Sequence, residues 1–314
     1  MPDRGNIRSG IISVIILLMV HATLFAQYER PGSSSAQFLK IGVSARAAGM
    51  SNAYIAPVRG AEAVYYNPAA IARIENTAIL FTHNRWFAGI SHDFFAIAHN
   101  FGRFGSFGFS VTSFLTDEMK VRTPLQPDGT GETFYSGNFR VGVSYARSMT
   151  DRVEFGGTVS YIRSELYKSY NEDAVAIDIA TLYVTHFRDF RFGIRIANFG
   201  SSMTYVDEAY PLPINFTFGF SMNVIERPGN KLLGTVSVTK PNEGKPLGQV
   251  GVEWNVDRIL FLRSGYNLNH SVETYSFGGG VALQVQGLTL NVDYSYSGYK
   301  LLGAVHRLSI GIQL

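Results

Sequence analysis

The residues of this chain that could carry chemistry are few and poorly placed for it. Its 314 residues include no Cys and seven His, and no two histidines have the spacing of zinc ligands. Ser91, His92 and Asp93 are the residue types of a hydrolase triad, but successive side chains on an extended chain point to opposite faces and cannot converge. We therefore predict a non-enzymatic protein with no catalytic residues, no metal site and no cofactor.

A run of three glycines is the other feature that suggests a reaction site. Gly278-Gly279-Gly280 is the kind of sequence that cradles a phosphate when it opens a helix. Here it lies inside a strand pattern with no helix behind it. We expect a bend in the strand, or the close approach of another segment of the chain.

The elements that hold these residues alternate in polarity with a period of two. In the last segment one face carries Leu308, Ile310, Ile312 and Leu314, and the other carries Arg307, Ser309, Gly311 and Gln313. This pattern is typical of a strand whose two faces meet different surroundings. It recurs in segments of about ten residues from Thr77 onward. His83 and His92 fall at the ends of the first hairpin, which favours an interfacial or loop position over metal binding.

Side-chain size indicates which face of each strand points outward. The polar faces carry Gly, Ser, Thr and Asn with few Lys, and such small side chains suit the crowded interior of a membrane β-barrel. A soluble sandwich or propeller is the alternative, but its outward polar faces carry many Lys and Glu, and no blade repeat of about 40 residues is visible. Five aromatic residues near strand ends are expected in the interfacial girdles: Trp254, Phe261, Tyr275, Tyr294 and Tyr296.

The alternating segments predict an all-β membrane protein, a transmembrane barrel of about fourteen antiparallel strands over residues 77–314. The longest loops are expected near residues 124–133 and 200–213, where Pro and Gly gather. The expected strands are 77–85, 92–101, 104–117, 134–148, 152–167, 172–187, 189–199, 212–225, 231–240, 246–256, 259–269, 273–286, 288–297 and 304–314.

Charged residues on the predicted inner face are the most informative polar positions. Their mixed signs predict an ion-pair network that holds a plug, and a ligand pathway through the lumen is the alternative. Arg46, from the segment before the barrel, is an expected partner for one of the acids. The inward charges are Arg140, Asp178, Arg191, Arg195, Glu253, Arg263, Asp293 and Arg307.

Composition and the N-terminus agree with export to a bacterial outer membrane. Arg4 and Arg8 flank a short apolar run that ends in small residues around Ala26, which predicts a signal peptide at 1–26. An uncleaved inner-membrane anchor is the alternative, but the run is shorter than the ~20 apolar residues that a spanning helix needs. Charged residues are 16% of the chain, below the ~25% of soluble domains. The net charge of +3 forms no basic stripe, so nucleic acid is not an expected partner.

Residues 37–76 break the strand pattern, and we predict an N-terminal plug segment over residues 27–76. The segment is rich in Ala, and small residues let short helices and turns pack inside a barrel that its own side chains cannot fill. Asn67-Pro68 is a turn signal, with Pro68 placed to open a helix at 69–72. The plug motif therefore centres on Arg46, Gly49, Met50, Asn67, Pro68 and Ala69.

The plug motif resembles the opening of the PorV/PorQ family, which belongs with FadL-like outer-membrane barrels. The resemblance lies in the stretches 38–42, 45–50, 52–56 and 65–72. Two departures affect turns: Ser51-Asn52 replaces a typical Gly-Gly, and Ala70 replaces a typical Gly. Leu314 also stands where such barrels often end in Phe.

This resemblance implies two possible functions for an outer-membrane protein. PorV-type members serve type IX secretion, which would make secreted cargo proteins or secretion-system components the partners beside outer-membrane lipid. FadL-like members pass hydrophobic small molecules such as long-chain fatty acids, which is the alternative. The chain leaves little room for long loops that grip cargo.

Overall fold

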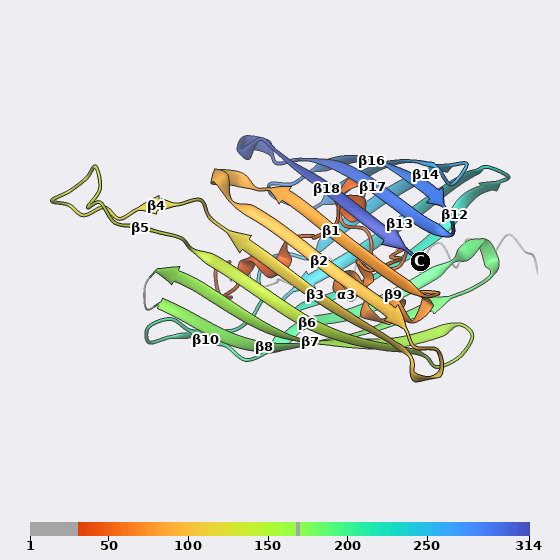
Figure 1. The fold of residues 1–314 in the computed structure, drawn as a ribbon, viewed down its shortest axis with the longest axis horizontal. Coiled ribbons are helices and arrows are strands. Elements are labelled where there is room, and N and C mark those ends of the chain that lie inside the picture. The colour runs from red at the N-terminus through yellow and green to blue at the C-terminus, as the bar shows by residue number, and fades with distance from the viewer. Residues whose placement is uncertain (1–30, 168–169) are drawn as a thin grey trace, which may run out of the picture.

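The computed structural model of the protein describes residues 31–167 and 170–314, which form a closed barrel around a folded N-terminal segment (Figure 1). The predicted signal peptide at 1–26 lies outside the described residues. Fourteen antiparallel strands make the barrel, and the predicted fold is confirmed. They are β1 Thr77–Arg85, β2 Ser91–Asn100, β3 Ser106–Leu115, β6 Gly137–Ser148, β7 Val153–Tyr167, β8 Tyr170–Val184, β9 Arg191–Gly200, β12 Asn215–Arg227, β13 Asn230–Pro241, β14 Leu247–Val256, β15 Leu260–Leu268, β16 Tyr275–Val285, β17 Leu288–Gly298 and β18 Ala304–Gln313.

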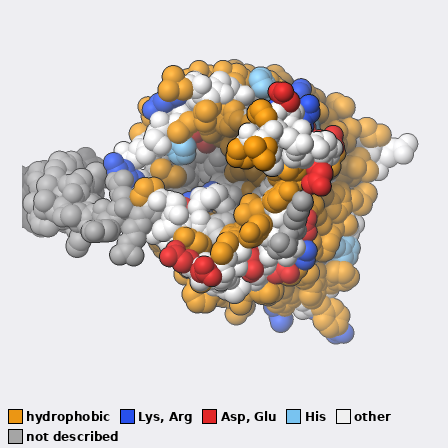
Figure 2. All heavy atoms as spheres, turned by 90° about the vertical axis from the view of Figure 1, so that its left-hand side faces the viewer, with side chains coloured by type: hydrophobic (Ala, Val, Ile, Leu, Met, Phe, Trp, Pro, Cys, Tyr) orange, Lys and Arg blue, Asp and Glu red, His pale blue; other side chains and the backbone are white. Residues whose placement is uncertain are grey.

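The barrel closes where β18 pairs with β1, and the wall strands otherwise pair with their neighbours along the chain. Their faces differ as the alternation predicts. On β18, Arg307 and Ser309 are each 1% exposed, whereas Leu308 between them is 46% exposed. Figure 2 shows apolar side chains over the outer wall. The apolar face therefore meets lipid and the small polar face lines the interior.

The two ends of the barrel carry connections of different length. Residues 116–136 and 201–214 connect strands at one end, which lies on the left of Figure 1, and the C-terminus lies toward the other end. Outer-membrane barrels have short periplasmic turns and longer extracellular loops. The end with the long loops is therefore the extracellular end, and Thr77 and Gln313 lie at the periplasmic end.

Both long loops contain small hairpins that the sequence did not predict. One pairs β4 (Met119–Lys120) with β5 (Thr133–Phe134) and projects far from the wall (Figure 1). The other pairs β10 (Met203–Thr204) with β11 (Ala209–Tyr210). The sequence predicts these stretches only as loops.

The segment before β1 folds into four short helical elements inside the barrel. These are η1 (Gln37–Lys40), α2 (Ala45–Gly49), α3 (Ala63–Tyr66) and η2 (Pro68–Arg73). The last is a 3-10 helix at the place where a helix opened by Pro68 was expected. Side chains of this plug form one buried cluster with Phe94 and Leu182 of the wall.

Four further 3-10 turns join wall strands: η3 Phe87–Gly89, η4 Gly102–Phe104, η5 Phe187–Asp189 and η6 Lys300–Leu302. Over residues 31–167 and 170–314, no helix has the length and apolar character needed to cross a membrane.

Candidate functional site

The plug lies directly against glycines of the wall. A Cβ atom placed on Gly265 would lie 2.3 Å from the backbone carbon of Met50, and one placed on Gly49 would lie 3.0 Å from the Cα of Gly278. Any side chain at Gly265 would therefore displace backbone. The glycine run on β16 thus has the close approach expected for it, since Gly49 of the plug packs there.

Asn67, Pro68 and Ala69 form the second plug contact. The Asn67 carboxamide accepts a hydrogen bond from the Ala69 amide (3.2 Å) and donates to the Ile55 carbonyl (3.0 Å). This caps η2 at its N-terminus, where Pro68 lacks a donor and needs no partner. A Cβ on Gly156 of β7 would lie 2.7 Å from Ala69. The predicted turn motif therefore packs the plug against β7, which lies across the barrel from the β16 strand that Gly49 contacts.

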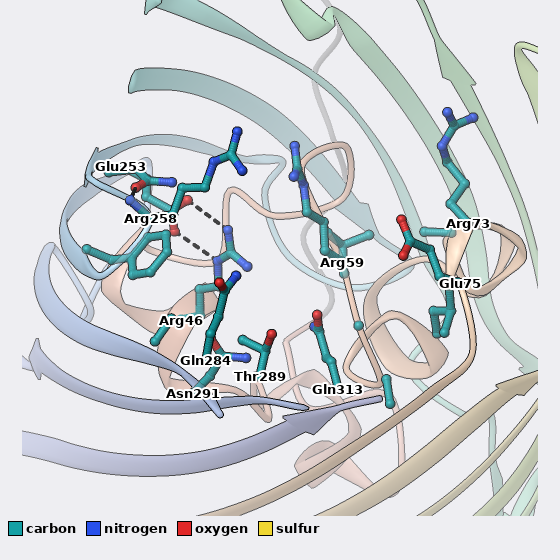
Figure 3. A pocket seen from close by; sticks show the side chains of 18 of the residues that line it. Arg46, Arg59, Arg73, Glu75, Glu253, Arg258, Gln284, Thr289, Asn291 and Gln313 are labelled. Atoms are coloured by element: carbon teal, nitrogen blue, oxygen red, sulfur yellow. Dashed lines mark hydrogen bonds and ion pairs between the residues drawn. The ribbon is translucent and has the colours of Figure 1, made fainter. Parts of the chain in front are cut away.

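A buried ion-pair cluster joins the plug to strands β14, β15 and β17. Arg46 makes two hydrogen bonds to Glu253, with N···O distances of 2.8 and 2.7 Å (Figure 3). Arg263 donates to Glu253 (2.7 Å) and to Asp293 (2.6 Å). Two arginines thus alternate with two carboxylates. The expected partnership of Arg46 with an inward acid is present, and removal of one member would leave a buried charge uncompensated.

Tyr65 of the plug lies between two inward arginines. The guanidinium carbons of Arg140 and Arg195 are 5.7 and 5.6 Å from its ring centre. Arg140 also pairs with Asp178 at 3.0 Å, and both side chains are 2% exposed. Asp178 accepts from the Asn198 amide, where β8 and β9 lose register. Cation–π contacts and one ion pair therefore hold the aromatic end of α3.

The remaining two inward charges stand apart from these clusters. Arg191 pairs with Asp189 in the periplasmic turn η5 (3.0 Å). Arg307 is 1% exposed, donates weakly to Ser297 (3.4 Å) and lies 5.6 Å from the Trp86 ring. No carboxylate within the described residues forms a salt bridge with Arg307. All eight predicted charges are buried in the interior, but they form separate contacts and not one network.

The structure adds charged residues that the sequence analysis did not single out. Arg73 of η2 pairs with Glu154, whose side chain is 1% exposed. Because Glu154 lies on the inward parity of β7, its alternation could have identified it. At the extracellular end, residues 33–40 lie against Glu243, and we call this segment the strap. Glu243 is in the loop between β13 and β14, so strand alternation could not identify it.

Glu243 fastens the strap with four donors. It accepts from the amides of Ser33 (2.8 Å) and Ser34 (3.1 Å), from the Gln37 side chain (2.7 Å) and from Lys40. Burial opposes ionisation of this carboxyl, but the hydrogen bonds from Lys40, Ser34 and Gln37 outweigh it and lower its pKa to about 2. The carboxylate therefore stays ionised at neutral pH.

Two sequence expectations are wrong. Phe261 was assigned to an interfacial girdle, but it lies on the inward parity of Arg263 and contacts Arg46, with 5.9 Å from the guanidinium to the ring centre. His92 was expected at an interface or in a loop, but it lies on β2, faces the interior and is 2% exposed. In contrast, His83 is outside and pairs with Asp93 (2.7 Å), so His92 and Asp93 are on opposite faces as predicted.

A cavity remains on each side of the packed plug. The periplasmic cavity has a volume of about 640 Å³, and charged and amide side chains line it together with apolar ones (Figure 3). The extracellular cavity has about 330 Å³ and includes Leu39, Tyr65, Arg195 and Glu243 in its lining. Between them Met50 and Tyr54 are fully buried. Within residues 31–167 and 170–314, no group of three or more acidic or His side chains could hold a metal ion.

This arrangement defines a class of protein, an outer-membrane β-barrel closed by its own N-terminal plug. Residues 26–246 match the family model described as type IX secretion system protein PorV. The chain belongs to this family. No curated protein matches the sequence.

Solved structures show the same fold in proteins of distant sequence. The toluene transporter TbuX of Ralstonia pickettii has a TM-score of 0.54 at 14% identity, over 84% of this chain and 96% of that one. The monoaromatic hydrocarbon channel CymD has 0.56 at 11% identity, over 86% and 96%. A Pseudomonas aeruginosa FadL homologue has 0.55 at 10% identity, over 86% and 97%. The chain is thus similar in fold to FadL-type channels, and its sequence family is PorV.

Proposed function

We propose that this protein is a non-enzymatic component of type IX secretion that binds exported proteins, or other components of the system, at its extracellular end. The observation that carries this proposal is the match to the PorV family over residues 26–246. That range contains the plug and both extracellular hairpins. We also propose that the chain divides into a signal peptide at 1–26, a plug at 27–76 and a barrel at 77–314.

The extracellular hairpins support the binding role. Leu125 at the tip of the first is 94% exposed, and Val206 between the strands of the second is 71% exposed. A partner that binds at these tips would remove both apolar side chains from water, which is favourable in proportion to the area buried. The middle of the barrel, in contrast, is filled by the buried plug and offers no surface to a partner.

The test is secretion by a strain that carries the double variant Leu125→Ser and Val206→Ser. We expect a several-fold decrease in surface-attached cargo and its accumulation in the periplasm. Met149→Ser is the matched control, because Met149 is also an exposed apolar tip (68%) but lies in a turn at the periplasmic end. Normal secretion and attachment in a strain without the gene would contradict the proposal, as would a genome that lacks type IX components.

A channel for hydrophobic small molecules is the second candidate. Its support is the fold shared with hydrocarbon channels and the extracellular cavity, where Leu39, Ile55 and Leu247 contribute apolar surface. A deletion strain should then take up long-chain fatty acids or aromatic hydrocarbons more slowly. Uptake at the parental rate would remove the support for this candidate.

A further inference from the structure

The periplasmic cavity gathers basic side chains that the plug contacts do not neutralise completely. Its lining includes six basic residues, and only Glu75 and Glu253 are acidic; the basic ones are Arg46, Arg59, Arg73, Arg191, Lys231 and Arg258. Three of them come from the plug, Arg191 comes from β9, Lys231 comes from β13, and Arg258 lies in the turn between β14 and β15. Figure 3 shows Arg46, Arg59, Arg73 and Arg258 around this one space.

Some arginines of this cavity share a carboxylate or have none. Asp189 pairs with both Arg59 (2.7 Å) and Arg191 (3.0 Å), so one carboxylate serves two guanidinium groups. Arg258 forms no salt bridge within the described residues, and only its backbone amide is bonded, to Asn255. The Arg59 side chain is 50% exposed. Two guanidinium groups therefore retain donors for an incoming anion.

The rest of the lining offers hydrogen bonds without charge. Gln284, Asn291 and Gln313 line the cavity (Figure 3), and their side chains have no hydrogen-bond partner among the described residues. Amide side chains can pair with a peptide backbone, while an arginine fork binds a carboxylate with two parallel bonds. The volume of about 640 Å³ lies within the ~300–1,000 Å³ of ordinary ligand sites.

We propose that this periplasmic cavity binds an acidic peptide segment of a protein that arrives from the periplasm, with Arg59 and Arg258 contacting its carboxylates. The proposal rests on the proposed function, because exported polypeptides reach this end of the barrel first. A membrane lipid is disfavoured, since the cavity lies inside the barrel wall at its periplasmic end and a lipid would have to leave the bilayer to reach it. The site would let the periplasmic and extracellular ends contact the same client in turn.

The test is binding of a fluorescein-labelled hexapeptide of alternating Glu and Gly to the full-length protein in a zwitterionic detergent, followed by fluorescence anisotropy. We expect saturable binding that is at least tenfold weaker for the Gln–Gly peptide. Arg258→Gln should weaken it several-fold and Arg59→Gln/Arg258→Gln at least tenfold. Arg122→Gln, which removes the same charge from the extracellular loop, should leave it unchanged. Heat-modifiable migration on gels verifies that each variant is folded.

Several results would overturn the inference. Equal binding of the Gln–Gly peptide, or unchanged binding by the double variant, would contradict it directly. So would displacement of the labelled peptide by inorganic phosphate at the same concentration as by unlabelled acidic peptide, or capture of phosphatidylglycerol vesicles without any peptide binding. The last two indicate a simple anion site and a lipid site. Failure here with a secretion defect in the Leu125→Ser/Val206→Ser strain would reject only the peptide site. Peptide binding with normal secretion in the deletion strain would reject only the proposed function.

Discussion

The middle of the barrel and its two ends use polar side chains in opposite ways. In the middle, Glu253 and Arg263 are buried and bonded to each other, Arg46, which is 20% exposed toward the periplasmic cavity, bonds to the same Glu253, and glycines bring plug and wall backbones together. At the ends, Arg59 and Arg258 reach water, and apolar tips such as Leu125 project outward. The inward charges join the plug to the wall, and recognition is proposed only for the ends. In an open hydrophobic channel the middle would be hollow and apolar.

The largest effect should come from filling the space that the plug backbone occupies. In Gly265→Leu the added Cβ would lie only 2.3 Å from the backbone carbon of Met50. The plug must therefore move, or the barrel must fail to assemble. We expect a loss greater than the ~1–3 kcal/mol of ordinary overpacking, seen as loss of the heat-modifiable form on gels or as protease cleavage in the plug. Gly279→Leu is the control, because its Cβ would meet nothing closer than 3.9 Å. Equal folding of the two variants would mean that the plug does not pack tightly against this wall.

A smaller effect is expected when the buried charge pairing is broken. Glu253→Gln leaves Arg46 without its carboxylate, and removal of one member of a buried pair typically costs about 3–5 kcal/mol. Urea unfolding in detergent micelles should therefore begin at a clearly lower concentration. Glu226→Gln serves as the control, since its pair with Lys231 is exposed on both sides and should have no measurable effect. A wild-type urea profile for Glu253→Gln would show that these charges do not hold the plug.

The smallest effect is expected at the extracellular strap. The pKa of Glu243 is lowered to about 2, below the ~4.3 of a free Glu. The ionised Glu243 therefore stabilises the strap fully above about pH 4.3, and this stabilisation is lost as the pH falls toward 2. A probe on Ser33→Cys in this Cys-free chain should show the strap held at pH 5 and released progressively below pH 4. With Glu243→Gln added, the strap should be looser at neutral pH and respond little over this range. Release between pH 7 and 5 in the parent would contradict the assignment to Glu243.

The alternation predicted the barrel because a wall residue must face either lipid or the interior. The expected strand 92–101 differs by one residue from β2 at Ser91–Asn100, and parity placed all eight charges inside. The error at Phe261 arose because its aromatic type was given more weight than its parity with Arg263. Contacts such as Arg73 with Glu154, 81 positions apart in the chain, depend on how the plug is seated, and no local pattern contains that. The contacts of Glu243 with the strap could not be predicted for the same reason. The two small hairpins have strands of only two residues, which are too short to show an alternation of polarity.

The most direct test of the plugged barrel is the ion conductance of the purified protein in a planar lipid bilayer, compared with a variant that lacks residues 45–74. The structure predicts that the full-length protein stays closed, because side chains such as Met50 and Tyr54 leave no exposed surface in the middle. The deletion should produce stable, large conductance steps if its barrel assembles, which heat-modifiable migration establishes beforehand. Stable conductance by the full-length protein, or a folded deletion variant that does not conduct, would contradict the account.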